Sequence, residues 1–490
     1  MYLGIDIGTS AVKIIVVDEA ENVRATATAG IETLRPQPLW SEQNPDDWWT
    51  AIGAAIAELR RAMGGRFGAI GAIGLSGQMH GNVVLDREMR PIRPAIIWND
   101  GRSLAECDEL RHLVPGIGTL CGVPPMPGFS APKYLWLKKH EPENFALIRH
   151  VMLPKDFVRL KMTGELATDM CDASGTLLLD VSQRQWALTV VEACGLSPGM
   201  LPTLMEGTEI SGALRADVAA QWGLKPGIPV VAGAGDAAAG AIGAGAVNEG
   251  DAFISLGTSG QYFIARETYA PSPERFIHTF GHSLPGRWFQ MAAMLNGASP
   301  LGLAAQLLGE PDIAKLLAEA EAEQQRAPQL YFLPYLTGER TPHNDPYAKG
   351  AFIGLTPATT RGQATRAVLE GTGFMLADCQ EILGRTGALP AEVGVVGGGS
   401  KSPLWMQIIA DMLGRPVLQV EAGEAGPALG AARLARLGAT GEAVNDVCRK
   451  PKVTRRFAPD PQAHGAYATR LKVFRETYLA LKPVFRMGAE

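Results

Sequence analysis

The chain has 490 residues, of which 46% are hydrophobic and 19% are charged. This amount of apolar surface excludes a disordered chain, and the length exceeds what one hydrophobic core usually spans, so two or three domains are expected. The formal net charge of −5 argues against a protein that binds the phosphate backbone of nucleic acids.

The cysteines and the apolar segments indicate where the protein works. Six scattered cysteines include no C-x-x-C pair, which indicates a reducing compartment and predicts a cytoplasmic protein without a zinc ribbon. The first residues carry no basic segment, so we expect no signal peptide. Residues 228–247 form an apolar run, but Pro229 and Asp236 within it argue against a membrane span.

A strand, a Gly-Thr-Ser turn and a second strand occur at the start of the chain and again about half the chain further on. The first copy covers residues 3–15 and the second covers residues 252–264. The repetition predicts a duplicated β-hairpin, and therefore an α/β protein with two similar halves. The junction between the halves is expected near residues 240–252.

Other strands and helices are expected between and after the hairpins. Asn44, followed by Pro45 and two acidic residues, predicts the start of a helix. Residues 70–76 and 228–233 are predicted to be buried strands, and residues 393–396 a short one.

The second half is expected to continue in the same style. A helix is predicted from about residue 403 to residue 413, and the basic residues 449–456 are expected to form an exposed loop. An amphipathic helix is predicted near the end of the chain, because apolar side chains recur there at spacings of four and three: Tyr467, Leu471, Phe474, Tyr478 and Leu481.

The end of the first strand offers a candidate site for phosphate and metal. Asp6 precedes the turn that contains Thr9 and Ser10, and Lys13 follows it. Such a turn can present N–H groups and hydroxyls to phosphate while the carboxylate holds hydrated Mg²⁺. An ordinary hairpin turn is the alternative, but the second copy favours a duplicated nucleotide site. Ser255 stands where Asp6 would be in that copy, so only the first half offers a carboxylate.

Asp236 is a candidate general base. It follows the strand at residues 228–233 and precedes a run of Ala and Gly, so that a ligand could approach the carboxylate closely. An Asp that caps the following helix is an equally good interpretation of this segment alone. The small residues after Asp236 predict close helix–helix packing between the halves.

Three further segments could bind ligands. Residues 397–400 follow a strand and precede a helix, which suits a nucleotide, although the pattern is not the G-x-G-x-x-G of dinucleotide sites and a plain turn is the alternative. Residues 78–80 and 98–102 each follow a strand, at the edge where α/β sheets bind ligands, and surface loops are the alternative. His278 and His282 lack a third ligand, so we expect no metal there.

Taken together, these motifs resemble the FGGY carbohydrate kinases, and among them the xylulose kinase subgroup, over nearly the whole chain. The resemblance implies two ribonuclease H-like domains that close on a cleft for ATP and a sugar. It assigns sugar and phosphate binding to an N-terminal domain, residues 1–245, and nucleotide binding to a C-terminal domain, residues 246–490. The segments that carry the resemblance are residues 4–10, 38–49, 128–137, 338–343, 397–405 and 425–430.

The resemblance also implies a role for each candidate residue. Asp236 would be the catalytic base, Asp6 a second catalytic residue, and both would be ligands of Mg²⁺. The small-molecule sugar would be bound by Gln78, Met79, His80 and Asp236. The residues implied to bind ATP are Thr9, Ser10, Lys13, Gly257, Thr258, Gly398, Gly399 and Ser402.

The reaction implied is the phosphorylation of D-xylulose by ATP to D-xylulose 5-phosphate, and a homodimer is a further expectation. One position departs from the family, which usually has Asn after the catalytic Asp, where this chain has Ala237. Losing one buried hydrogen bond costs ~1–3 kcal/mol of substrate discrimination. Ribulose, L-xylulose or a pentitol therefore remains an alternative substrate. An actin-like ATPase switch would share the phosphate turns and is the alternative from another class.

Overall fold

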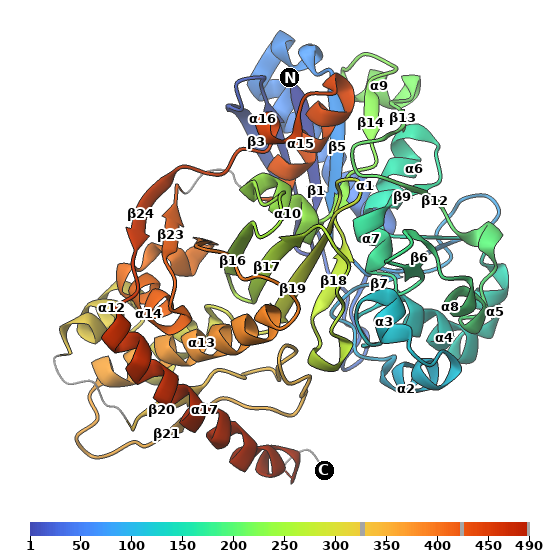
Figure 1. Ribbon diagram of the computed structural model, residues 1–490. Coiled ribbons are helices and arrows are strands. Elements are labelled where there is room, and N and C mark those ends of the chain that lie inside the picture. The colour runs from blue at the N-terminus through green and yellow to red at the C-terminus, as the bar shows by residue number, and fades with distance from the viewer. Residues whose placement is uncertain (324–328, 422–425, 488–490) are drawn as a thin grey trace.

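The computed structural model describes residues 1–323, 329–421 and 426–487. Ala425, the first residue of one of the family-like segments, lies outside them. Within the described residues, two seven-stranded sheets make up the centre of the molecule (Figure 1). No helix in these ranges is both long enough and apolar enough to cross a membrane.

The first sheet is built from the first half of the chain. Its strand order is β13-β14-β5-β1-β2-β3, with β15 also paired to β5. β1 runs parallel to β5 and antiparallel to β2, so Asp6 lies opposite Ser76 on one side and Lys13 on the other. The strands are β1 (Tyr2–Ile7), β2 (Ala11–Val17), β3 (Val23–Gly30), β5 (Ala72–Gly77), β13 (Ile210–Ala213), β14 (Pro229–Val231) and β15 (Ala234–Gly235).

The second sheet repeats this order in the second half of the chain. The series β19-β17-β16-β22-β23-β24 corresponds strand by strand to β3-β2-β1-β5-β14-β13, and β18 is added at one edge. The predicted duplication of the hairpin is confirmed by β1–β2 and β16–β17. The strands are β16 (Ala252–Leu256), β17 (Gly260–Arg266), β18 (His278–Gly281), β19 (Trp288–Met294), β22 (Val393–Val396), β23 (Val417–Val420) and β24 (Val453–Phe457).

Helices cover both sheets. α1 (Pro45–Met63) packs on β2 and β3, and its predicted start is confirmed because the Asn44 side chain accepts a hydrogen bond from the Asp46 N–H. The predicted helix at residues 403–413 is α14 (Pro403–Leu413). It packs with α13 (Arg361–Gly384) and with α17 (Pro461–Met487), whose buried side chains include the predicted Tyr467, Phe474 and Tyr478.

One expectation about the second half is wrong. Residues 453–457 are not a loop but the edge strand β24, antiparallel to β23. Arg455 and Arg456 are exposed on it, and charged side chains are common on edge strands because they discourage pairing with other chains.

Two helices join the halves. α15 (Pro427–Thr440) comes from the second half, yet it packs on β1 and β5 of the first sheet and crosses α10 (Asp236–Ala244). Figure 1 shows the orange-red α15 beside the blue strands of the first sheet. The crossing is close because glycines face backbone there: a Cβ on Gly430 would collide with the Ala239 carbonyl. The predicted close packing of the Ala/Gly run is thus confirmed.

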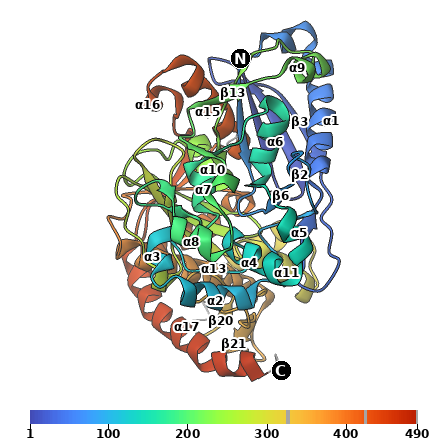
Figure 2. The same ribbon diagram turned by 90° about the vertical axis from the view of Figure 1, so that its right-hand side faces the viewer.

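A smaller lobe is inserted between β5 and β14 and forms one wall of the cleft. Figures 1 and 2 show it beside the first sheet, with the two termini at opposite ends of the molecule. Its helices are α2 (Leu104–Leu113), α3 (Ile117–Cys121), α4 (Ser130–His140), α5 (Pro142–Leu147), α7 (Met170–Ser174) and α8 (Leu188–Ala193). The helix α6 (Pro154–Thr163) of the same insertion packs on β5 and α1 of the first half.

Candidate active site

The first Gly-Thr-Ser turn is held in place by a network of buried amides. The Thr9 hydroxyl accepts a hydrogen bond from Trp98 Nε1 at 2.8 Å, and the Thr9 carbonyl accepts one from Gln43 Nε2 at 2.6 Å. Gln78 donates to Gln43 Oε1 at 2.7 Å, and the Trp48 indole donates to the same oxygen. Gln78 therefore supports the first Gly-Thr-Ser turn through Gln43.

Asp6 at the end of β1 and Asp236 directly after β15 lie on either side of β5, at the same edge of the first sheet. Burial raises the pKa of Asp6 to about 6, while the Ser76 hydroxyl and Lys13 act in the opposite direction. Burial and the charge of Asp6 raise the pKa of Asp236 to about 7. Asp6 Oδ1 is buried and has no hydrogen-bond partner in the part of the chain described. Two nearby carboxylates with an unsatisfied oxygen would be stabilised by a cation.

Asp236 is the first residue of α10, and it lines a cavity of about 340 Å³. Gly235 occupies the N-cap position and no side chain caps the helix, so the interpretation of Asp236 as an N-cap is wrong. Residues from both halves of the chain line this cavity. Its lining consists of Asp236, Ala237, Gly240 and Ala244 from α10, and of Phe253, Ser255, Gln261, Val396, Gly397, Gly426 and Pro427 from the second half.

His80 lies in the left-handed backbone region, with φ of 70°. Its carbonyl accepts hydrogen bonds from Lys133 Nζ at 2.8 Å and from Ser130 Oγ at 3.0 Å, which hold this backbone conformation. Its Nδ1 lies 2.7 Å from the Gly175 carbonyl oxygen. Because a carbonyl only accepts, Nδ1 carries the proton and Nε2 is left as an acceptor. Burial lowers the pKa of His80 to about 3, so the ring is neutral.

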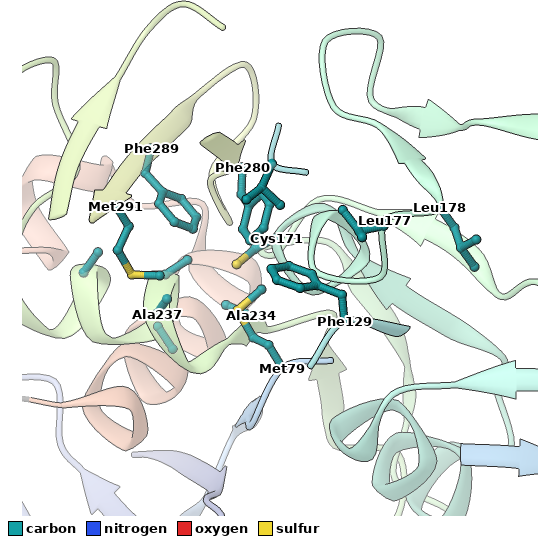
Figure 3. Packing of buried hydrophobic residues seen from close by; sticks show 14 of the residues in the cluster. Met79, Phe129, Cys171, Leu177, Leu178, Ala234, Ala237, Phe280, Phe289 and Met291 are labelled. Atoms are coloured by element: carbon teal, nitrogen blue, oxygen red, sulfur yellow. The ribbon is translucent and has the colours of Figure 1, made fainter. Parts of the chain in front are cut away.

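Apolar side chains surround His80 and Asp236. The His80 ring packs on Phe129, with 4.3 Å between the ring centroids, and Phe129 meets His278 at 5.5 Å. Met79 packs against Gly235, directly before Asp236. Figure 3 shows Met79, Phe129 and Phe280 converging on the segment that carries Ala234 and Ala237. These contacts exclude water from one side of the cleft.

The second Gly-Thr-Ser turn lies beside residues 397–400, which were predicted to bind a nucleotide. The Gly257 and Thr258 carbonyls accept hydrogen bonds from Ala298 N and Gly297 N, at 2.6 and 2.9 Å. A Cβ on Gly397 would lie 2.7 Å from the Leu256 carbonyl oxygen, so the two loops touch. Gly398 and Gly399 follow in a 3₁₀ turn, and Ser402 caps α14 by accepting from Trp405 N at 3.2 Å. The structure therefore brings all the predicted nucleotide residues of the second half together.

A fully buried ion network behind Asp236 was not predicted. Lys155 Nζ lies 2.5 Å from Asp156 and 2.8 Å from Asp169, and Arg159 Nη1 lies 2.6 Å from Asp156. Arg159 also donates to the carbonyl of Ala232, on the segment that leads to Asp236. The signal in the sequence is the set of charged residues within the apolar segment 153–162, which could have been interpreted as paired and buried.

Ser130 and Lys133 were also not assigned a role from the sequence, although their segment carries the family resemblance. Both act on the His80 carbonyl from about fifty residues away. The residues next to Ser130 and Lys133 in the sequence form no pattern that predicts such a contact.

Comparisons with known families agree with this geometry. The family described as "FGGY family of carbohydrate kinases" matches with its N-terminal domain over residues 1–243 and with its C-terminal domain over residues 252–439. The chain belongs to the FGGY family of carbohydrate kinases. The resemblance seen in the sequence motifs is thereby confirmed, and with it a sugar kinase that acts on a small molecule.

Relatives cover almost the full chain. The xylulose kinase of Escherichia coli K12 is 46% identical over 99% of this chain and 100% of its own length, and that of Bacillus subtilis is 35% identical over 98% and 97%. Among solved structures, a xyloylose kinase from Brucella ovis matches with a TM-score of 0.95 at 43% identity, covering 99% of each chain. The xylulose kinase of Rhodospirillum rubrum matches with 0.92 at 31%, also covering 99% of each. The expected fold of two ribonuclease H-like domains is confirmed by these structures.

Proposed function

We propose that this carbohydrate kinase transfers the γ-phosphoryl group of ATP to D-xylulose and forms D-xylulose 5-phosphate. The observation that carries the proposal is the position of Asp236, on the cavity that joins both halves. Ser255 and Gly397 line this cavity from the second half. The neutral His80 follows Met79, which packs against Gly235 directly before Asp236. The names and the full-length similarity of the curated relatives support D-xylulose as the acceptor.

The side chains divide the work as follows. His80 Nε2 accepts a hydrogen bond from a sugar hydroxyl, Met79 packs beside the sugar, and Gln78 supports this edge of the pocket together with the Thr9 turn. Asp236 takes the proton of the terminal hydroxyl as its oxygen attacks the γ-phosphorus. The bond from that phosphorus to the β,γ-bridging oxygen breaks, and its electron pair leaves with ADP.

The nucleotide is proposed to lie between the two turns. Thr9, Ser10 and Lys13 face its phosphates from the first half, and Gly257 and Thr258 face them from the second. Gly398, Gly399 and Ser402 lie beside the adenine. The division of the chain at residues 245 and 246 into a sugar-binding and a nucleotide-binding domain belongs to this proposal.

Asp6 and Asp236 fit Mg²⁺. Asp6 offers an unsatisfied buried oxygen, and a carboxylate pair is the type of ligand this ion prefers. Within the described residues no three His, Cys, Asp or Glu side chains gather as a metal site, so phosphate and water would complete the coordination. When bound, Mg²⁺ would neutralise the charge that develops on the phosphates.

Ala237 is the reason why another sugar is retained as an alternative substrate. This residue is 6% exposed and packs among apolar side chains, so it offers no amide to a substrate hydroxyl. Ribulose, L-xylulose or a pentitol is therefore the second candidate. The actin-like switch is not retained, because the family is one of carbohydrate kinases.

The test combines a panel of sugars with one variant. Wild type is assayed with Mg-ATP and each pentulose and pentitol, and D-xylulose is expected to have the highest kcat/KM. Asp236→Asn is expected to keep its affinity for ATP and sugar but to lose kcat by two to four orders of magnitude, because the base is gone. Near-normal turnover of Asp236→Asn would refute its role as base, and preference for another sugar would refute the substrate.

Two properties of the whole molecule complete the proposal. A cytoplasmic location is supported by the six cysteines, which are all buried and free. A homodimer stays a prediction, which light scattering of the purified protein tests.

A further inference from the structure

The segment 338–341 lies directly beside the second phosphate turn. Glu339 Oε1 accepts a hydrogen bond from Leu295 N at 2.7 Å, and the Gly338 carbonyl accepts one from Asn296 Nδ2 at 3.0 Å. The next residue, Gly297, donates to the Thr258 carbonyl. Arg340 is therefore held one short segment away from the turn that we assign to the nucleotide phosphates.

The same segment also lies beside the wall of the sugar pocket. Thr341 N donates to the Ala293 carbonyl at 3.1 Å, and Thr341 Oγ1 donates to the Phe276 carbonyl at 3.0 Å. Phe276 is two residues from His278, whose ring meets Phe129 in the aromatic wall behind His80. Arg340 is close enough to lower the pKa of both His80 and His278. Arg340 is thus near both histidines of the proposed sugar pocket, while its own segment adjoins the second Gly-Thr-Ser turn.

Arg340 is a partly buried cation, and the charge of the adjacent Glu339 acts on it without forming an ion pair among the described residues. Across the described ranges, its guanidinium forms no ion pair and no hydrogen bond. The neighbouring Glu339 carboxylate instead accepts from two backbone N–H groups. Other buried arginines are paired: Arg102 with Asp100, Arg159 with Asp156 and Arg433 with Glu21. An unpaired charge away from water is costly, so an arginine in this state points to an anion that arrives with a ligand.

The groups around Arg340 indicate which anion that is. His80 and His278 are neutral, and His80 Nε2 is an acceptor suited to a hydroxyl. A sugar of the proposed class carries no charge. The phosphoryl group is the anion that passes between the second turn and the sugar, and the planar guanidinium can bind two of its oxygens at once.

We infer that Arg340 is a further catalytic residue, which binds the phosphoryl group during its transfer and holds it on the sugar phosphate product. The inference rests on the proposed function. Arg340 does not change the bonds made or broken: the γ-phosphorus leaves the β,γ-bridging oxygen and joins the sugar oxygen. The guanidinium compensates the charge on the oxygens of that phosphorus. It comes from the second half, so it links this charge to closure of the cleft.

The test compares Arg340→Met, Arg340→Lys and the control Arg275→Met, which removes an exposed arginine near the same segment. For Arg340→Met we expect kcat to fall 100-fold or more, since a lost charge donor in phosphoryl transfer costs two to five orders of magnitude. The dissociation constant of D-xylulose should change less than threefold, and that of D-xylulose 5-phosphate should rise at least tenfold. Arg340→Lys should recover part of both losses, and Arg275→Met should match wild type.

A measurement of stability separates this role from a structural one. Without ligands, Arg340→Met should melt at the same temperature as wild type or higher, because it removes an unpaired buried charge. A lower melting temperature together with weaker binding of the free sugar would overturn the inference, and so would an unchanged affinity for the sugar phosphate. If wild type phosphorylates a sugar other than D-xylulose, the same comparison is made with that sugar and only the proposed substrate fails. A wild type that phosphorylates none of the sugars would overturn the proposed function and, with it, this inference.

Discussion

His80 shows how much of this site depends on single side chains placed by distant ones. A non-glycine residue with a positive φ is strained, and the strain is retained here by Ser130 and Lys133 on the next lobe. The bond to Gly175 fixes the tautomer, so the free nitrogen can only accept. The pocket therefore presents an acceptor in His80 and a second acceptor in Asp236, a combination that suits the hydroxyls of a polyol.

Asp236 makes the ligand-free protein sensitive to pH. Its pKa in the folded protein, about 7, lies above the ordinary value of 3.8. Between pH 4 and pH 7 the folded state therefore binds more protons than the unfolded state, and wild type loses stability as the pH rises through this range. Asp236→Asn does not titrate. We expect its stability advantage over wild type to grow from pH 4 to pH 7, to a few kcal/mol at ~1.4 kcal/mol per pKa unit, and then to level off.

Thermal unfolding at pH 5 and pH 8, in EDTA and without nucleotide, measures this difference. Asp217→Asn serves as control, because this carboxylate is largely exposed and pairs with Arg215 on the surface. Its effect should be nearly the same at both pH values. An advantage of Asp236→Asn that shrinks as the pH rises would contradict the assigned environment of Asp236.

At the scale of elements, the contact between α10 and α15 decides how closely the halves approach. Gly430 of α15 meets the backbone of Ala239, and Gly74 of β5 meets the backbone of Ala431. Glycine is required at such points for want of space, although it weakens a helix. The first sheet can accept a helix from the far end of the chain only because these side chains are absent.

Gly430→Ala is expected to destabilise the protein by ~1–3 kcal/mol, because the added methyl group must push α15 away from α10. The matched control is Gly302→Ala in α11 (Ser299–Leu307), where the added Cβ meets nothing within 4 Å. Better helix propensity should make that variant more stable by ~0.5–1 kcal/mol. Chemical denaturation of both variants measures the two effects, and equal effects would show that the crossing is not tight.

The sequence predicted elements whose signals are local. The cap at Asn44 lies within a few residues, the apolar spacing lies within one helix, and each copy of the repeated turn is a short segment; all three are confirmed. The edge strand β24 was not predicted, since its exposed arginines resemble a loop. The amide network of Gln43 and Gln78 was not predicted either, because its partners are distant in the chain and only packing brings them together. The ion network of Lys155 was not predicted although Asp156 is its neighbour in the chain, because the charges alone do not show that the segment is buried.

At the scale of the whole molecule, two sheets of the same strand order face each other across α10 and α15. A cavity of about 570 Å³ lies at the carboxyl end of α10, between the connection at residues 245–251 and the second sheet. Its lining includes Ala244 and Phe253, which also line the cavity at Asp236. Open space at the connection would allow the second sheet to move when sugar and nucleotide bind, in agreement with a kinase that excludes water before transfer.

The first half should not fold properly alone. A fragment of residues 1–245 lacks α15, so the apolar face formed by β1, β5 and α10 would be exposed to water. We expect this fragment to aggregate or to bind a hydrophobic dye, and a version with residues 426–441 attached through a flexible linker to be more soluble. A monomeric, cooperatively unfolding fragment without the added helix would contradict this expectation.

The late position of α15 in the chain has a consequence for biosynthesis. A ribosome makes the strands of the first sheet early, but the helix that covers them is encoded beyond residue 426. From the completion of this sheet at Gly235 until α15 has been made, one face of the nascent sheet therefore remains exposed. Chaperones that bind apolar surfaces during elongation would remain longest on this face of the sheet. They would be released when α15 packs on it.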